Sequence, residues 1–293
     1  MLRQLLLATA LLLPATLLAE PVQIEHAGLR LNANLELAGH DSLQGQDVVL
    51  ITHGTLAHGR MELISALQNV LAESGVASLA PTLSLGVDNR SGMYDCATAH
   101  RHRHQDAVDE LGRWSDWLQQ QNSSRILLLG HSRGGNQTAL FSRTQTTGQL
   151  MGQVLLAPMT WNTEQEHTAY AQRFGQSLHP LLKQAQTQHT GPMPAPIGFL
   201  YCEDAQVNAE SLLSYYSDDP DRHTPNLLAH TRLPTLVIAA SDDKVVPELP
   251  TAMTSVQNSQ VHLVTIEGAD HFFRDLYTYD VVDQVLEFMM EQP

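Results

Sequence analysis

The sequence predicts an α/β fold with a mostly parallel central sheet, helices on both faces of that sheet and a separate insertion. Three observations support this prediction. Short aliphatic runs alternate along the chain with segments of helical periodicity, as strands and helices do in parallel α/β sheets. A glycine-bounded serine turn lies between one such run and a following helical segment. The alternation stops at residue 159 and resumes after residue 230.

The first half of the chain opens with residues 22–37, whose loose alternation predicts an antiparallel hairpin. Residues 47–52 are rich in β-branched side chains, as expected of a buried parallel strand. Gly75 ends a helical pattern whose apolar residues recur every three to four positions. A turn-rich loop covers residues 81–99. The strands predicted in this half are 47–52, 76–80 and 125–129, and the helices are 61–74, 105–121 and one that opens near residue 133.

The second half supplies the remaining strands and the insertion. Residues 159–230 are rich in Gln, His, Pro, Ser and Thr and include a Gly/Pro-rich stretch at 191–196, which favours an insertion over a sheet layer. We therefore expect a body formed by residues 20–158 and 231–293. Its later strands are 154–158, 234–239 and 261–266, and its terminal amphipathic helix is 276–290.

Composition limits the classes of partner. The 293 residues, 43% of them hydrophobic, suffice for one α/β domain with an insertion. The formal net charge is −15, which argues against binding to nucleic acid and to anionic membrane surfaces. The oligomeric state is not readable from these features.

Residues 1–19 have the pattern of a secretory signal peptide. Arg3 precedes an almost wholly apolar run from Leu5 to Leu18, and Ala19 completes an imperfect small-residue cleavage site. We expect a periplasmic or secreted protein with no stable membrane anchor after cleavage. Retention of the segment as an uncleaved anchor stays open, whereas lipidation is disfavoured because no cysteine follows the run. Export permits a disulfide between Cys96 and Cys202, and two separate buried thiols are the alternative.

Gly130-His131-Ser132-Arg133-Gly134 fits the pattern Gly-x-Ser-x-Gly, in which a serine occupies a strained turn between a strand and a helix. The residues two before and two after the serine must be small because strand and helix approach closely. The serine hydroxyl is then exposed at a helix N-terminus, where backbone N–H groups favour a developing negative charge. The pentapeptide is weak evidence alone, but its strand and helix context supports a nucleophile.

A serine nucleophile needs a base and a carboxylate that orients the base. Asp243 follows the strand at 234–239, and His271 follows the strand at 261–266. Both therefore lie at carboxyl ends of strands, where ligands bind in such sheets. Asp242 is the rival acid, and Asp270 is interpreted as local support or surface.

Together these motifs make the chain resemble the α/β-hydrolase fold family over roughly residues 45–290. The matching features are His53-Gly54 after a strand, the Ser132 turn, Asp243 in a D-x-x-V-P setting, and Gly268-x-x-His271. The resemblance implies Ser132 as nucleophile, His271 as general base and acid, and Asp243 as the orienting carboxylate. It also gives residues 159–230 the position of the variable cap.

The resemblance further implies an oxyanion hole of two backbone N–H groups. One belongs to Arg133, and the other belongs to Thr55, with Leu56 as the next candidate. The large cationic side chain of Arg133 either meets an anionic substrate group or pairs with a nearby acid.

Histidines cluster in two places. His53 and His131 flank the predicted site and are interpreted as packing and hydrogen-bonding residues. His100, His102 and His104 alternate with arginines, and three interpretations stay open: a metal site, the polar start of the following helix, and a loop at the mouth of the pocket. The stretch 83–96 also has an unusual composition for which the sequence offers no mechanism.

The sequence thus predicts an exported serine hydrolase that cleaves an ester of a small acyl substrate through an acyl-enzyme, with no cofactor or metal. Thioesterase, amidase or peptidase, and acyltransferase activities use the same three residues and remain alternatives. A non-catalytic binding protein on the same fold is the alternative from another class.

Overall fold

The computed structural model describes residues 20–145 and 148–292, so the predicted signal peptide at 1–19 lies outside the described residues. The central sheet has the strand order β1-β2-β4-β3-β5-β6-β9-β10, and from β4 to β10 the neighbouring strands are parallel. The first two strands form the predicted antiparallel hairpin, and β2 is antiparallel to β4. The predicted α/β fold class is confirmed. The strands are β1 (Glu20–His26), β2 (Leu29–Glu36), β3 (Val48–Thr52), β4 (Ala77–Thr82), β5 (Ile126–His131), β6 (Leu150–Leu156), β9 (Thr235–Ala240) and β10 (Val261–Ile266).

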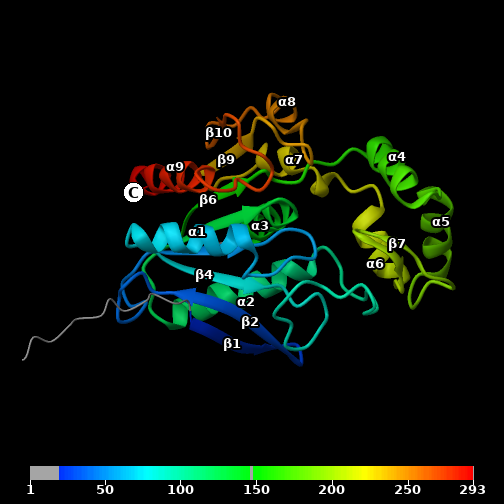
Figure 1. Ribbon diagram of the computed structural model, residues 1–293, viewed down its shortest axis with the longest axis horizontal. Helices are drawn as coiled ribbons and strands as arrows, with labels where there is room; N and C mark the ends of the chain where they lie inside the picture. Colours follow the sequence, from blue (N-terminus) through cyan, green and yellow to red (C-terminus); the bar gives the residue numbers. More distant parts are fainter. Residues whose placement is uncertain (1–19, 146–147, 293) are drawn as a thin grey trace, which may run out of the picture.

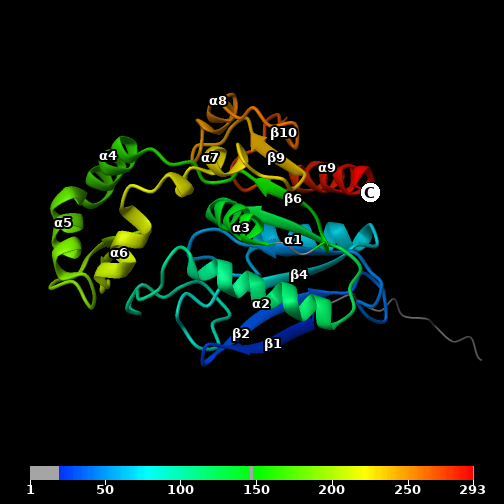
Figure 2. The same cartoon turned by 180° about the vertical axis from the view of Figure 1, so that it is seen from behind.

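Helices cover both faces of this sheet (Figures 1 and 2). On one face α1 (Glu62–Glu73) packs against α9 (Tyr277–Glu291), and on the other α2 (Asp106–Gln120) packs against α3 (Arg133–Thr144). The short α8 (Leu249–Met253) lies between β9 and β10 in the chain. Every residue of β3, β5 and β9 is buried, which explains their near-continuous apolar sequences. In the described ranges no helix combines the length and apolar character needed to cross a membrane.

Residues 159–230, which we call the cap segment, hold their own small elements between β6 and β9. Figure 1 shows most of them beside the body rather than over the sheet faces. Their apolar cluster includes Phe199 and Tyr215 from the cap segment and also Leu56, Leu83 and Tyr94 from body loops. The cap segment thus packs against these body loops in one apolar cluster. The elements are α4 (Thr163–Phe174), α5 (Leu178–Gln188), β7 (Ile197–Phe199), β8 (Cys202–Ala205), α6 (Ala209–Tyr216), the 3₁₀ helix η1 (Pro220–Arg222) and α7 (Thr224–Leu228).

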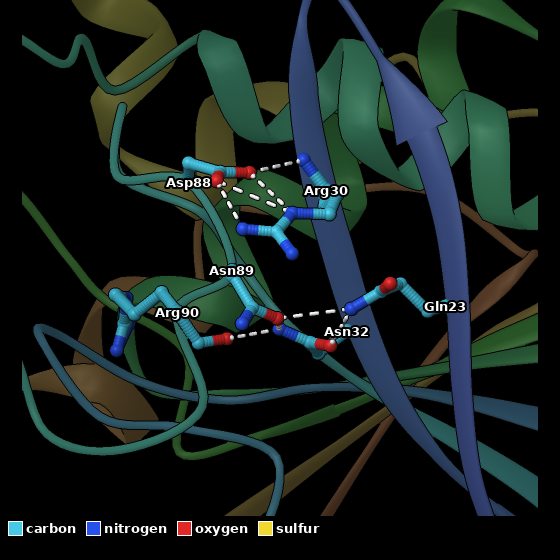
Figure 3. A network of polar contacts seen from close by, with 6 residues as sticks. All are labelled: Gln23, Arg30, Asn32, Asp88, Asn89 and Arg90. Carbon is cyan, nitrogen blue, oxygen red and sulfur yellow. Dashed lines mark hydrogen bonds and ion pairs between the residues drawn. The ribbon is translucent and has the colours of Figure 1, made fainter.

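The loop between β4 and α2, residues 83–105, is fastened at several points. Figure 3 shows its outer part, where Arg30 forms an ion pair with Asp88 (2.6 Å) and the Asn32 side chain donates to the Arg90 carbonyl (2.9 Å). The buried Arg90 guanidinium donates to the carbonyls of Leu83 and Ala57. Ala57 belongs to the loop after β3, so residues 83–105 support the predicted oxyanion loop.

A disulfide and several hydrogen bonds join this loop to the cap segment. Cys96 and Cys202 form a disulfide. The His100 N–H donates to the Gln206 carbonyl (2.7 Å), and the Asn208 N–H donates to the His100 carbonyl (3.0 Å). The unexplained composition of residues 83–96 therefore has a structural reason, because this stretch connects the loop after β3 with the cap segment.

Candidate active site

Ser132 lies at the tip of the turn between β5 and α3, with φ 56° and ψ −123°. This backbone conformation is strained for a residue with a side chain and persists only where the surroundings enforce it. The Ser132 N–H donates to the Leu156 carbonyl (2.9 Å), and the Met159 N–H donates to the Ser132 carbonyl (3.0 Å). The end of β6 thus holds the strained turn in place.

Gly130 and Gly134 are required for the steric reason that the motif predicts. A Cβ atom on Gly130 would lie within 3.0 Å of the Gly134 carbonyl oxygen, and one on Gly134 would lie within 3.0 Å of the carbonyl oxygens of Thr52 and His53. These oxygens belong to the backbone and cannot move aside cheaply. A side chain at either position would therefore force β3, β5 and α3 apart.

Asp243 and His271 are hydrogen-bonded to each other. His271 Nδ1–H donates to Asp243 Oδ2 (2.8 Å), and both side chains are buried. The other carboxylate oxygen of Asp243 accepts the N–H groups of Val245 (2.6 Å) and Val246 (2.9 Å). Burial would raise the pKa of Asp243, but the hydrogen bonds from His271 and the two N–H groups outweigh it and lower that pKa. The carboxylate therefore stays ionised and fixes the imidazole with Nε2 free.

The two other acids of this region lie elsewhere. Asp242 is exposed, and its side chain makes no contact with His271 among the described residues. Asp270 accepts the Phe272 N–H (2.9 Å) and pairs with Arg274 (2.8 Å), so it supports its own loop, as expected.

His131 connects the serine turn with His271. Its Nε2–H donates to the His271 carbonyl (2.9 Å), and the two rings have centroids 4.9 Å apart. Burial lowers the pKa of His131 to about 3, and the neighbouring His271 acts in the same direction. His53 is likewise buried and accepts the Leu83 N–H (3.0 Å). Neither ring is placed to act as a second base.

The Ser132 hydroxyl makes no hydrogen bond to His271 Nε2 within the described part of the chain. Such bonds are often long in ligand-free enzymes and shorten when substrate binds. His131, which directly precedes Ser132, holds the His271 backbone beside the serine turn. The structure therefore brings Asp243 and His271 into contact and fixes both next to this turn.

The predicted oxyanion donors surround Ser132. Gly54 approaches the serine so closely that an added Cβ would lie 3.3 Å from Ser132 Cβ. Thr55 and Leu56 follow, and Leu56 has a positive φ of 55°. The N–H groups of Thr55, Leu56 and Arg133 have no partner among the residues that the structure describes. An oxyanion hole requires unpaired donors of this kind.

A cavity of about 380 Å³ includes Ser132 and is lined from both body and cap segment. A second cavity of about 510 Å³ shares Thr55, Arg133, Glu166 and Tyr201 with it, so the two adjoin. A third hollow of about 420 Å³ lies between α1 and α9 and contains none of the predicted catalytic residues. The space next to Ser132 therefore extends toward the cap segment.

Comparison with known proteins identifies the family of the chain. The sequence profile of the Alpha/beta hydrolase family matches residues 48–283, which span the serine turn and both partner residues. The chain belongs to this family. No curated protein matches the sequence of this hydrolase.

Solved structures share the fold at low sequence identity. Est1E from Butyrivibrio proteoclasticus with bound ferulic acid is 20% identical, with a TM-score of 0.69 over 92% of this chain and 98% of that one. An esterase from Pyrococcus furiosus is 16% identical, with a TM-score of 0.59 over 94% and 91%. A dienelactone hydrolase from Anabaena variabilis is 17% identical, with a TM-score of 0.56 over 94% and 97%. These likenesses show the fold.

The structure contradicts two of the three interpretations of the histidines at 100, 102 and 104. The rings of His100, His102 and His104 are fully buried and precede α2, so they neither start that helix nor line the mouth of a pocket. Hydrogen bonds join His100 Nδ1 to His102 Nε2 (3.1 Å) and His102 Nδ1 to the Tyr215 hydroxyl (2.8 Å), and His104 Nε2–H donates to Asn136 Oδ1 (2.7 Å). Partners on α6 and α3 are the physical reason for this burial. In the described ranges no three metal-binding side chains form a group.

Three residues near the site had no distinct sequence signal. Tyr215 contacts both His102 and the Arg133 guanidinium, which lies 5.2 Å from the centre of its ring. Arg90 holds the loop after β3 by donating to the Ala57 carbonyl. Arg222 is almost completely buried behind Trp161. Each depends on partners far away in the sequence, so periodicity and local motifs could not identify them.

Proposed function

We propose that this hydrolase cleaves carboxylic esters with Ser132 as nucleophile and an acyl-enzyme as intermediate. The main support for this proposal is the buried hydrogen bond between Asp243 and His271. His131 holds the His271 backbone beside the strained Ser132 turn. An oriented base next to an exposed hydroxyl at a helix N-terminus is the arrangement that activates serine. Alcohols leave more easily than amines, which favours esters over amides.

In the proposed cycle His271 Nε2 takes the hydroxyl proton while Ser132 Oγ bonds to the ester carbonyl carbon. The N–H groups of Arg133 and Thr55, with Leu56 next, stabilise the oxyanion. His271 then gives the proton to the departing alkoxide, and the ester C–O bond breaks. Water repeats the sequence on the acyl-enzyme and releases the acid and free Ser132. Asp243 stabilises the imidazolium in both halves.

We also propose that residues 1–19 direct export and are removed, and that residues 159–230 act as the cap that selects the substrate. The disulfide between Cys96 and Cys202 supports export, since such bonds persist in oxidising compartments. Two cavities lined by both body and cap segment support the second proposal.

A fluorophosphonate probe tests the central proposal, because it reacts with activated serines. The mature wild type should be labelled on the peptide that contains Ser132 and should hydrolyse short phenyl esters. Ser132→Ala should lose labelling and about 10⁴-fold or more in turnover. Ser142→Ala is the matched control, since the hydroxyl of this serine on α3 donates to the Ala139 carbonyl of its own helix. A folded wild type without labelling or turnover would instead favour the binding-protein alternative.

A further inference from the structure

Arg133 presents a fixed and unneutralised positive charge to both cavities. Its Nε–H donates to the Thr55 hydroxyl (2.9 Å), and its guanidinium stacks on the Tyr215 ring at 5.2 Å. These contacts orient the charge without cancelling it. No acidic side chain of the described residues forms an ion pair with Arg133, and its buried Nη1 has no hydrogen-bond partner there. Of the two alternatives for the Arg133 side chain, the ion pair with a nearby acid is therefore absent from the described residues.

Arg222 supplies a second cation nearby. It is 2% exposed and stacks at 4.5 Å on the ring of Trp161, which lines the Ser132 cavity. Its Nε and Nη1 have no hydrogen-bond partner among the described residues. Burial lowers the pKa of Arg222 to about 10, Asp219 opposes that shift, and repulsion by Arg133 adds to it. The two guanidiniums therefore repel each other inside the protein.

The acidic side chains near Arg133 and Arg222 form no ion pair with either arginine in the described part of the chain. Asp219 Oδ1 accepts the Asp221 N–H, and Asp218 accepts the Thr163 hydroxyl. Asp221 forms its ion pair with Arg143. Glu166 lines both cavities but makes no ion pair among the described residues. Asp219, Glu166 and Asp218 thus attract Arg222 only from a distance, and a buried arginine without a direct ion pair is rare because its desolvation is costly.

We propose that Arg133 binds a carboxylate carried by the ester substrate, and that Arg222, buried against Trp161, adds to the positive potential of the Ser132 cavity. This inference rests on the proposed ester hydrolysis. The planar fork of a guanidinium matches a carboxylate in geometry and charge. Arg133 directly follows the nucleophile and lines the cavity that contains it, so a carboxylate bound there positions the rest of the substrate at Ser132. Glu166 in the same space disfavours a dianion such as a phosphate monoester.

Two matched pairs of esters test the preference. The first compares phenyl hydrogen adipate with its neutral methyl ester, and the second compares 4-acetoxybenzoate with its methyl ester. The measured quantity is the ratio of kcat/KM values within a pair, divided by the corresponding ratio for hydrolysis by hydroxide. We expect a ratio of about 10 to 100 in favour of the anionic ester in at least one pair, as for a charge-assisted hydrogen bond.

Arg133→Met should bring that ratio close to one, because it keeps an unbranched side chain and the backbone N–H but removes the charge. Lys183→Gln is the control, since it makes the same change in net charge at an exposed position of α5, and it should keep the wild-type ratio. Arg222→Met provides a second variant, and circular dichroism checks its folding. Arg133 is partly exposed, so the test does not depend on whether the Arg222 variant folds.

The outcomes separate the two proposals. Wild-type ratios near one in both pairs, or a ratio unchanged by Arg133→Met, would overturn carboxylate recognition while leaving ester hydrolysis intact. No hydrolysis of any of the four esters would overturn the proposed function and this inference with it. Raising the salt concentration should reduce the wild-type ratio but not that of Arg133→Met, since salt screens charge interactions that reach solvent.

Discussion

Removal of the disulfide between Cys96 and Cys202 should cost a large part of the stability of this hydrolase. The bond closes a loop with a sequence separation of 106 residues. Such a closure removes about 16 cal/mol/K of entropy from the unfolded chain, equivalent to about 5 kcal/mol at 25 °C. Measured effects are often smaller, so we expect a loss of about 2–5 kcal/mol in the free energy of unfolding. Domains of this kind have only about 5–15 kcal/mol in total.

The double variant Cys96→Ala/Cys202→Ala is the perturbation, because alanine leaves no hydroxyl at the buried position of Cys202. Urea unfolding followed by circular dichroism and tryptophan fluorescence gives the free energy and its dependence on urea. Wild type treated with reductant should unfold together with the variant. A loss below about 1 kcal/mol with an unchanged urea dependence would refute the reasoning, since a released loop must expand the unfolded chain.

Two further predictions concern the ionisable groups. Asp243→Asn should reduce kcat by about 100- to 10⁴-fold, because the amide cannot hold the neutral His271 in the productive tautomer. Asp242→Asn, at an exposed position, should change kcat by less than about 2-fold. The reverse order in steady-state assays would transfer the role to Asp242. Burial lowers the pKa values of His102 and His104 to about 3, so between pH 6.5 and 3 the unfolded chain binds protons that the folded chain does not. Stability is therefore complete above pH 6.5 and falls with pH by about 1.4 kcal/mol per unit for each such histidine. His104→Gln should make the free energy of unfolding less steep between pH 6 and 4 by about one proton, and an unchanged slope in urea titrations would contradict this burial.

Much of the body could be predicted because its signals are local. The strands β3, β5 and β9 are buried on both faces, so their sequences are almost wholly apolar. The Ser132 turn was recognisable because both glycines lie at fixed spacing from the serine, although Gly134 is required by its approach to the carbonyl oxygens of Thr52 and His53 at the distant end of β3. Strand order placed Asp243 and His271 at the same edge of the sheet, and the family resemblance implied that they pair, as the hydrogen bond between them shows.

The rest depended on contacts between distant segments. His102 and His104 look like polar surface residues until Tyr215 and Asn136 supply their hydrogen bonds. Arg222 would also be assigned to the surface, because nothing in its neighbourhood in the sequence indicates the Trp161 ring against which it is buried. The cap segment lacks a single repeating pattern since its short elements bury their apolar faces against body loops as well as against one another.

Leu56 lies in the same apolar cluster as Phe199 of the cap segment, and the Tyr94 N–H donates to the Leu56 carbonyl (3.0 Å). The loop that is proposed to hold the oxyanion therefore takes part of its shape from the segment that is proposed to choose the substrate. In engineering terms, residues 159–230 are not an exchangeable module. A chimaera that transplants them onto another hydrolase would have to carry residues 83–105 as well, or specificity and turnover would change together.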